Sequence, residues 1–134
     1  MRWLLDTNIC IYLIKKKPPS VIQQLESQQV GEVGVSSITV AELYYGVEKS
    51  RYPSQNREAL EQFLIPLAIV DFDYLASAAY GKIRATLEAQ GTPIGSLDML
   101  IAAHAVSMDV TLVTNNVQEF ARMPNLKITN CVTG

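Results

Sequence analysis

The sequence predicts an α/β fold, in which a short central parallel sheet of four to five strands carries helices on both faces. Short apolar segments alternate along the chain with longer segments in which apolar residues recur at helical spacing. The apolar segments are nearly continuous rather than alternately polar, which is typical of strands buried on both faces. Since the chain has 134 residues, we expect one domain spanning residues 1–134.

Each predicted strand is a brief apolar run that ends at a polar or turn-forming residue. The first run, Trp3-Leu4-Leu5, ends at Asp6, and the second ends at Ser36-Ser37. Strands of a few residues are common in small sheets. The predicted strands cover residues 3–5, 33–35, 67–70 and 110–114, with a possible fifth at 126–128.

The helices are predicted from apolar spacing and from capping residues. We expect Thr7 or Asn8 to cap the first helix and Ser96 to cap the sixth. Thr39 is the expected cap of the third helix, with Glu42 at the spacing of a capping box. The predicted helices cover residues 9–13, 20–29, 38–50, 55–64, 74–90, 97–108 and 117–122.

The composition argues against a membrane protein, a secreted protein and a zinc protein. The longest uncharged apolar stretch, residues 99–108, is too short to cross a bilayer, and the N-terminus lacks the pattern of a signal peptide. The chain has two cysteines, Cys10 and Cys131, no CxxC pair and one histidine, His104, so a zinc or thiolate site is not expected. We therefore expect a soluble, cytoplasmic protein whose cysteines are free thiols.

The charge of the chain leaves nucleic-acid binding open. The net charge of −2, from 11 basic and 13 acidic residues, argues mildly against it. Aromatic residues such as Tyr44 and Tyr45 could stack on RNA bases, hold a partner helix or belong to the core. The basic residues nevertheless cluster in three places, at Lys15 to Lys17, at Lys49, Arg51 and Arg57, and at Lys82 and Arg84.

Acids and amides follow the predicted strands at positions that would bring them together. Asp6 follows the first strand, Glu42 lies early in the helix after the second, and Asp98 lies in the first turn of a helix. Asn115 and Asn116 follow the fourth strand. Ligands of open α/β sheets bind outside the carboxyl ends of the strands, so these side chains are expected at one edge. Clustered acids resist ionisation unless a cation such as Mg²⁺ compensates them, which favours metal-assisted hydrolysis.

Each of these residues also has a structural interpretation when it is taken alone. Asp6 could simply cap a helix, Glu42 could be a capping or solvated acid, and Asp98 could favour the helix dipole. Asn115-Asn116 could be a turn. The hypothesis of a site depends on their joint placement.

Four segments of the chain resemble, in order and in spacing, the four sequence motifs of PIN-domain nucleases. Within that family the pattern is most similar to VapC-type toxins of bacterial toxin–antitoxin pairs. The segments are Leu4-Leu5-Asp6-Thr7-Asn8, Ser36 to Gly46, Gly95 to Ala105, and Leu112 to Asn116 with Glu119-Phe120.

The resemblance implies a PIN-like three-layer αβα sandwich with endoribonuclease activity that depends on Mg²⁺, which Mn²⁺ can replace. It implies that Asp6, Glu42 and Asp98 bind the metal and that Asn116 occupies the position of a fourth acid. An amide there lowers the negative charge of the site, so a second metal is less secure. The supporting hydroxyls would be those of Thr7, Thr114 and Ser37.

The resemblance also implies partners. The substrate would be a structured RNA, with a tRNA anticodon loop, including that of initiator tRNA, as the usual case. A small antitoxin would wrap the nuclease with its C-terminal segment and send a basic side chain among the acids. The resemblance further implies a homodimer.

Three other functions compete with this one. A response-receiver domain needs a lysine directly after its fifth strand and an acid pair near its first, which this chain lacks. A haloacid-dehalogenase-like phosphatase needs a second acid where Asn8 stands. A non-catalytic PIN-like module that binds RNA or protein remains the alternative. His104 is expected to be packed rather than to act as a base.

Overall fold

The computed structural model describes residues 1–16 and 31–130 and contains a five-stranded, entirely parallel sheet. Its strand order is β3-β2-β1-β4-β5. The first strand of the chain therefore lies at the centre of the sheet, which confirms the predicted parallel sheet and its fifth strand. The strands are β1 (Trp3–Leu5), β2 (Val33–Ser36), β3 (Ala68–Val70), β4 (Thr111–Val113) and β5 (Lys127–Thr129).

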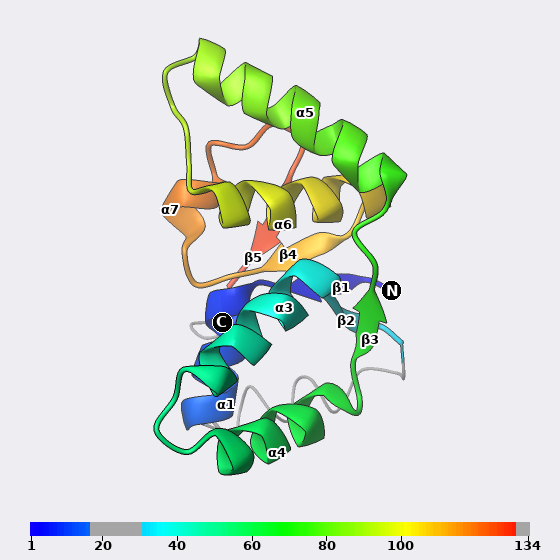
Figure 1. Ribbon diagram of the computed structural model, residues 1–134. Coiled ribbons are helices and arrows are strands. Elements are labelled where there is room, and N and C mark those ends of the chain that lie inside the picture. The colour runs from blue at the N-terminus through cyan, green and yellow to red at the C-terminus, as the bar shows by residue number, and fades with distance from the viewer. Residues whose placement is uncertain (17–30, 131–134) are drawn as a thin grey trace.

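Helices cover both faces of the sheet and give the three layers that were predicted (Figure 1). In this view α5 and α6 lie above the sheet, and α1, α3 and α4 lie below it. The predicted helix over residues 20–29 lies outside the described residues. The helices are α1 (Thr7–Lys16), α3 (Ser37–Glu48), α4 (Pro53–Leu64), α5 (Tyr74–Ala89), α6 (Ser96–Met108) and α7 (Val117–Phe120).

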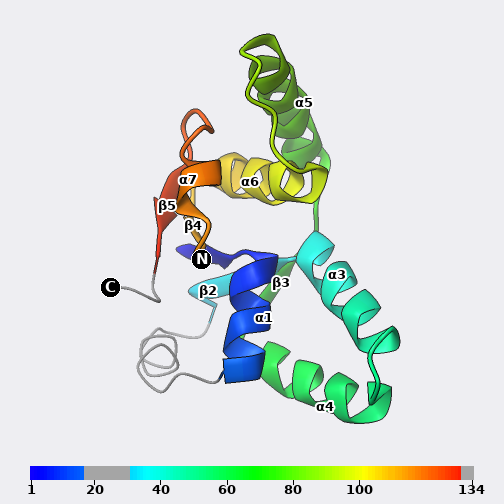
Figure 2. The same cartoon turned by 90° about the vertical axis from the view of Figure 1, so that its left-hand side faces the viewer.

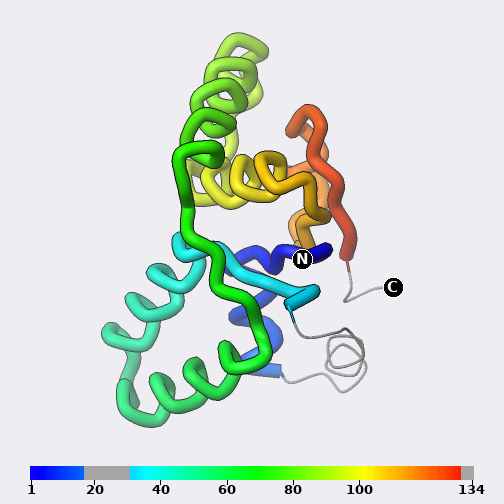
Figure 3. The backbone as a smooth tube through the Cα atoms, turned by 90° about the vertical axis from the view of Figure 1, so that its right-hand side faces the viewer, coloured from blue at the N-terminus to red at the C-terminus, as the bar shows by residue number. Residues whose placement is uncertain are grey.

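The chain crosses from the lower layer to the upper layer along one edge of the sheet. Figure 3 shows it rising from α4 through β3 and continuing into α5. Figure 2 shows the same layers from the side, with α5 and α6 above the sheet and α1, α3 and α4 below it. In Figure 1, α1 and α6 both begin at the left of the molecule, where α7 lies beside the first turn of α6. That side contains the carboxyl ends of β1 and β4, where the site is predicted.

The central strand divides the core into two halves. Leu4 and Leu5 are both fully buried, but consecutive strand residues point to opposite faces. Leu4 packs in the cluster formed with α5 and α6, and Leu5 packs in the cluster formed with α1, α3 and α4. A continuous apolar run was thus the correct signal for a strand buried on both sides.

No helix among residues 1–16 and 31–130 is long and apolar enough to cross a membrane.

The helix caps differ from the predicted ones. Asp6, rather than Thr7 or Asn8, caps α1, because its Oδ1 accepts a hydrogen bond from the backbone N–H of Ile9 (2.7 Å). The side chain of Ser36, rather than that of Thr39, caps α3. In both cases the helix begins directly where the strand ends, so the last polar residue before it becomes the cap.

Two further boundaries also differ. Gly95, without a side-chain hydrogen bond, precedes α6 in place of the expected cap Ser96, which is already helical. The fourth helix begins at Pro53 rather than at residue 55, since proline is favoured in the first turn of a helix, where its missing N–H costs nothing.

Glycine is required at position 34 by close packing. A Cβ atom added to Gly34 would lie 2.8 Å from the backbone oxygen of Ala68 on β3 and 2.2 Å from the sulfur of Met1. Real side chains do not approach backbone so closely, so a larger residue must push the neighbouring strand away.

We therefore expect Gly34→Ala to lower the free energy of unfolding by about 1–3 kcal/mol, because overpacking strains the pairing of β2 with β3. The matched control is Gly81→Ala on α5, where an added Cβ meets nothing within 4 Å. That substitution should raise stability by about 0.4–1 kcal/mol, since alanine favours the helix. Urea unfolding curves of both variants check the pair, and equal effects would contradict it.

Candidate active site

Asp6 lies at the junction of β1 and α1 and is almost completely buried, with 1% of its surface exposed. Besides capping α1, its carboxylate accepts a hydrogen bond at Oδ2 from the hydroxyl of Thr114 (2.5 Å). Burial raises the pKa of Asp6, and the hydrogen bonds from Thr114 and Ile9 oppose that rise. The Asp6 carboxylate is thus held in one orientation at the carboxyl ends of β1 and β4.

Asp98 is the second predicted acid at this edge, and it lies in the first turn of α6. Its pKa is raised from an ordinary 3.8 to about 6, first by burial, then by the charge and a hydrogen bond of Glu119, and then by the charge of Asp6. Three carboxyl groups from distant parts of the sequence therefore lie close enough to repel one another. We call Asp6, Asp98 and Glu119 the acidic cluster.

Glu119 is the member of the acidic cluster that the sequence reasoning missed as a site residue. Its Oε2 accepts a hydrogen bond from the amide of Asn116 (2.6 Å), and its Oε1 accepts one from the backbone N–H of Gly95 (3.3 Å). The resemblance pointed to Asn116 as the counterpart of the fourth acid, whereas the structure places Asn116 as a donor to the acid three residues later. The signal was present in the fourth motif, which ends in Glu119-Phe120.

Asn116 also supports the cluster through its backbone. Its N–H donates to the hydroxyl of Thr114 (2.9 Å), and that hydroxyl donates in turn to Asp6. A chain of hydrogen bonds thus connects the loop after β4 with two of the acids. A direct catalytic role for Asn116 stays a prediction.

Glu42 was predicted to join Asp6 and Asp98, and it is not among the groups whose charge raises the pKa of Asp98. It is the sixth residue of α3, half-buried, about 7.5 Å of helix rise beyond the start of α3. There it lines an apolar groove of about 150 Å³ between α1, α3 and α4. Within residues 1–16 and 31–130, no three acidic, histidine or cysteine side chains form a group that could hold a metal ion. The role of Glu42 as a metal ligand stays a prediction.

The three predicted supporting hydroxyls have different partners. Thr114 contacts Asp6 directly, as expected of a supporting residue. Thr7 shares a hydrogen bond with the hydroxyl of Thr39 on α3 (3.0 Å), and Ser37 accepts one from the backbone N–H of Phe72 (3.0 Å). Thr7 and Ser37 therefore tie α3 to its neighbours, and neither hydroxyl has a hydrogen bond to Asp6, Asp98 or Glu119 in these contacts.

His104 is buried within the fold, as expected, rather than exposed at the site. Its Nδ1 lies 2.9 Å from the hydroxyl of Ser36, and the edge of the Phe72 ring packs against the imidazole. Burial lowers the pKa of His104, so the imidazole is neutral near pH 7. Cys10 is also buried, and burial together with the charge of Asp6 raises its thiol pKa, which leaves it unreactive.

The chemistry of the acidic cluster fits a hard divalent cation. The donors are carboxylate oxygens with no thiol among them, and Mg²⁺ prefers such oxygens. Mg²⁺ needs only one or two carboxylates, because it keeps several waters. The raised pKa of Asp98 indicates negative charge that the protein itself does not neutralise. A cation at this edge would relieve that repulsion.

Comparison with known proteins identifies the family of this chain. The model of the PIN domain family matches residues 3–126. The chain belongs to the PIN domain family. Among its relatives, Ribonuclease VapC2 of Rickettsia felis is 47% identical and the match covers 97% of this chain and 98% of the relative. The tRNA(fMet)-specific endonuclease VapC of Shigella flexneri is 43% identical and the match covers 95% and 96%.

A solved structure of this PIN domain family has the same fold. The DNA-bound VapBC structure from Salmonella typhimurium contains a chain with a TM-score of 0.94 and 40% identity to this one, and 98% of each chain is covered. The similarity extends over the whole sheet and both helical layers, so the predicted three-layer α/β fold is confirmed.

The repulsion at Asp98 predicts a gain of stability when its charge is removed. The folded protein binds this proton more tightly than an ordinary Asp does, so stability is lost as the pH rises from about 4 to about 6. In EDTA at pH 7, Asp98→Asn should unfold at a temperature about 3–5 °C higher than the parent. This corresponds to about 1 kcal/mol after screening of a half-buried group and partial compensation by the α6 dipole.

The pH dependence provides the control for this prediction. The difference in melting temperature should narrow toward zero as the pH falls to about 3, because Asp98 is then protonated in both the folded and the unfolded protein. Thermal melts followed by circular dichroism measure it. An advantage of Asp98→Asn that does not change with pH would mean that charge repulsion is not its cause.

Proposed function

We propose that this PIN domain is a metal-dependent endoribonuclease that hydrolyses phosphodiester bonds in structured RNA, and that it is the toxin of a toxin–antitoxin pair. The observation that carries the proposal is the meeting of Asp6, Asp98 and Glu119 at the carboxyl ends of β1 and β4. Related VapC proteins are ribonucleases, and this supports RNA as the substrate.

Different residues at the site would bind the metal and hold the carboxylates in position. Asp6 and Asp98 would hold Mg²⁺ together with several waters, and Mn²⁺ can replace the ion. Glu119 and Glu42 would complete the site through such waters. Bound Mg²⁺ lowers the pKa of water and stabilises charge on phosphoryl oxygens. Thr114 fixes the Asp6 carboxylate, and Asn116 fixes that of Glu119, so neither acid must reorganise when substrate arrives.

The substrate we propose is the anticodon loop of a tRNA, with initiator tRNA first among the candidates. The tRNA(fMet)-specific endonucleases of Shigella flexneri and Salmonella typhimurium, which are 43% and 41% identical to this chain, support this choice. A single-stranded loop also exposes unstacked bases for recognition, whereas a duplex buries them.

The partner we propose is a small antitoxin that binds in the groove between α1, α3 and α4. Most residues lining this groove are apolar, and Glu42 supplies a negative charge at its wall. An amphipathic segment with one basic side chain has the matching chemistry. The solved VapBC assembly supports a partner of this kind.

We also propose that the protein is a homodimer in the cytoplasm. Ile69, Tyr74 and Leu75 are exposed apolar or aromatic residues, and their exposure supports the dimer.

The central test is cleavage of RNA. Purified protein in Mg²⁺ should cut a tRNA or stem-loop transcript, and EDTA should abolish the reaction because the acids lose their cation. Asp6→Asn and Asp98→Asn should each lower the rate more than about 100-fold, which exceeds the 10- to 100-fold typical of groups that merely support a metal ligand. Denaturing gels measure the products.

The matched control for these variants is Glu58→Gln, which removes an exposed acid of α4 far from the cluster. It should cleave at the parental rate. Circular dichroism shows that each variant is folded. Folded Asp98→Asn with full activity would overturn the proposed site, and RNA binding without any cleavage would favour the non-catalytic PIN-like alternative.

The groove predicts a variant that separates antitoxin binding from catalysis. An added Cβ at Gly46 meets nothing within 4 Å, so Gly46→Trp would fill the groove without a clash at its first atom. We expect the affinity for the antitoxin to fall at least tenfold, as measured by calorimetry. A tenfold fall corresponds to a loss of only about 1.4 kcal/mol of binding free energy. Antitoxin affinity equal to that of the parent would place the partner elsewhere.

A further inference from the structure

An exposed surface rich in aromatic and basic side chains lies where α3 turns into α4. It consists of Tyr45, Lys49, Arg51 and Tyr52, which we call the turn patch. The two rings are large and apolar, yet 61% of Tyr45 and 55% of Tyr52 is exposed to solvent. Aromatic side chains are normally buried, and their exposure next to cations needs a functional explanation.

In the turn patch each cation lies over the ring of a tyrosine. Lys49 Nζ is 4.9 Å from the centre of the Tyr45 ring, and the Arg51 guanidinium is 5.6 Å from that of Tyr52. These contacts hold charge and ring together on the surface. Two neighbouring units, each with a stacking surface and a positive charge, are thereby presented to solvent.

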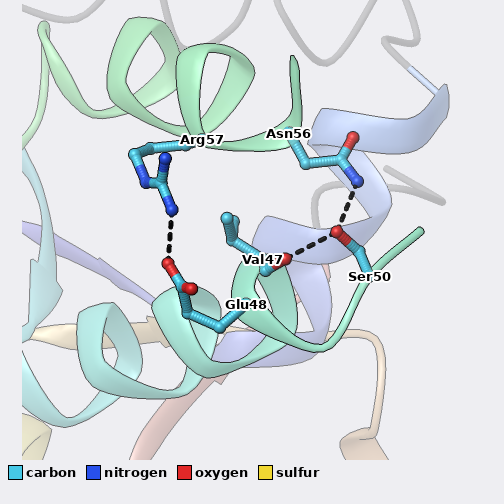
Figure 4. A network of polar contacts seen from close by, with 5 residues as sticks. All are labelled: Val47, Glu48, Ser50, Asn56 and Arg57. Carbon is cyan, nitrogen blue, oxygen red and sulfur yellow. Dashed lines mark hydrogen bonds and ion pairs between the residues drawn. The ribbon is translucent and has the colours of Figure 1, made fainter. Parts of the chain in front are cut away.

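The backbone beneath the turn patch is fixed by polar contacts (Figure 4). The hydroxyl of Ser50 donates to the carbonyl oxygen of Val47 (2.6 Å) and accepts from the amide of Asn56 (2.9 Å). Arg57 of α4 pairs with Glu48 of α3 (2.5 Å). The turn is therefore tied to both helices, and a ligand does not have to order it.

The turn patch is positive although the whole chain is negative. Residues 43–57 contain three basic side chains and one acid, a local charge of +2 against −2 for the whole chain. The acid, Glu48, is already paired with Arg57. None of the ion pairs within the described part of the chain includes Lys49 or Arg51, so both charges remain available to a ligand.

The patch also continues toward the predicted catalytic residues. Tyr45 on α3 and Lys49, the C-cap of α3, follow Glu42 by three and seven residues, which places all three along one side of the helix. Tyr45 lies about 4.5 Å and Lys49 about 10.5 Å of helix rise beyond Glu42. A chain bound along this stripe would run from the end of α3 to Glu42.

We propose that the turn patch binds a single-stranded segment of the RNA substrate, with bases stacked on Tyr45 and Tyr52 and phosphates beside Lys49 and Arg51. This inference rests on the proposed ribonuclease function and adds a substrate-binding surface to it. RNA loops are recognised by stacking of unpaired bases on aromatic rings and by cations that track the backbone. A protein partner would instead favour an apolar surface with few unpaired charges at its centre.

The test is binding of a fluorescein-labelled RNA stem-loop to the full-length protein, measured by fluorescence anisotropy in EDTA so that no RNA is cut. Lys49→Ala with Arg51→Ala should weaken binding and make the slope of log K against log salt shallower by about 1.4, or about 0.7 for each phosphate that is no longer neutralised. Tyr45→Ala should weaken binding about 5- to 150-fold, as removal of one stacking platform does. Tyr45→Phe should retain the affinity.

Matched controls come from α5, in the other helical layer. Lys82→Ala and Arg84→Ala each remove an exposed cation of α5 without touching the turn patch. Both should bind the RNA as the parent does. The inference is overturned if the Lys49 and Arg51 double variant keeps the RNA affinity and the salt dependence of the parent. It is also overturned if the α5 variants lose as much RNA affinity as the patch variants. A loss of self-association in sedimentation with unchanged RNA binding would assign the patch to a protein interface and also overturn it.

Cleavage of the same RNA in Mg²⁺ separates this inference from the proposed function. If the parent cuts the RNA and the patch variants bind it with parental affinity, the proposed role of the turn patch is wrong, but the proposed ribonuclease function is supported. If the parent binds the RNA through the turn patch but does not cut it, the proposed ribonuclease function is wrong, but the proposed role of the turn patch is supported. A parent that does not bind the stem-loop contradicts the turn patch.

Discussion

The buried carboxylate of Asp6 is the interaction on which the rest of this structure depends. One oxygen caps α1, the other accepts the Thr114 hydroxyl from the end of β4, and the residue itself ends the central strand. A charged group without these two donors would be costly at 1% exposure. The same bonds that make Asp6 tolerable in the core also aim it at the edge where Asp98 and Glu119 meet. Stability and chemistry thus share one side chain.

The acidic cluster has the opposite character to a stabilising network. Its members repel one another, as the raised pKa of Asp98 indicates, and the positive end of α6 relieves only part of that repulsion. The structure tolerates this because Asn116 and Gly95 hold Glu119 in place. A fold that keeps uncompensated acids together is organised for a ligand rather than for maximum stability.

The fold was predictable because its elements are locally encoded. The apolar runs at Leu4-Leu5 and Leu112-Val113 each form most of a short strand, and their residues are buried on both faces of the sheet. The caps were less predictable, because several adjacent polar residues could each cap the helix. The residue that does so is the one between the last strand residue and the first helical residue. At the start of α1 that residue is Asp6 rather than Thr7.

The site was predictable in part. Asp6 and Asp98 were found because each follows a strand or starts a helix at the expected edge. Glu119 was missed as a member of the acidic cluster because Asn116 occupies the more obvious position directly after the strand. The position of Glu42 relative to the cluster depends on how far along α3 it sits and on the direction of that helix. No sequence pattern gives that direction.

The pairing of β1 with β4 has a consequence for the newly made protein. Asp6 and Thr114 are 108 positions apart, and Glu119 follows later still. During synthesis the N-terminal half therefore emerges from the ribosome without its neighbouring strand on that side, and such non-local pairing forms late. A chain still attached to its ribosome cannot assemble the acidic cluster until almost its whole length has been translated, so the emerging polypeptide lacks that cluster among the RNAs that surround it.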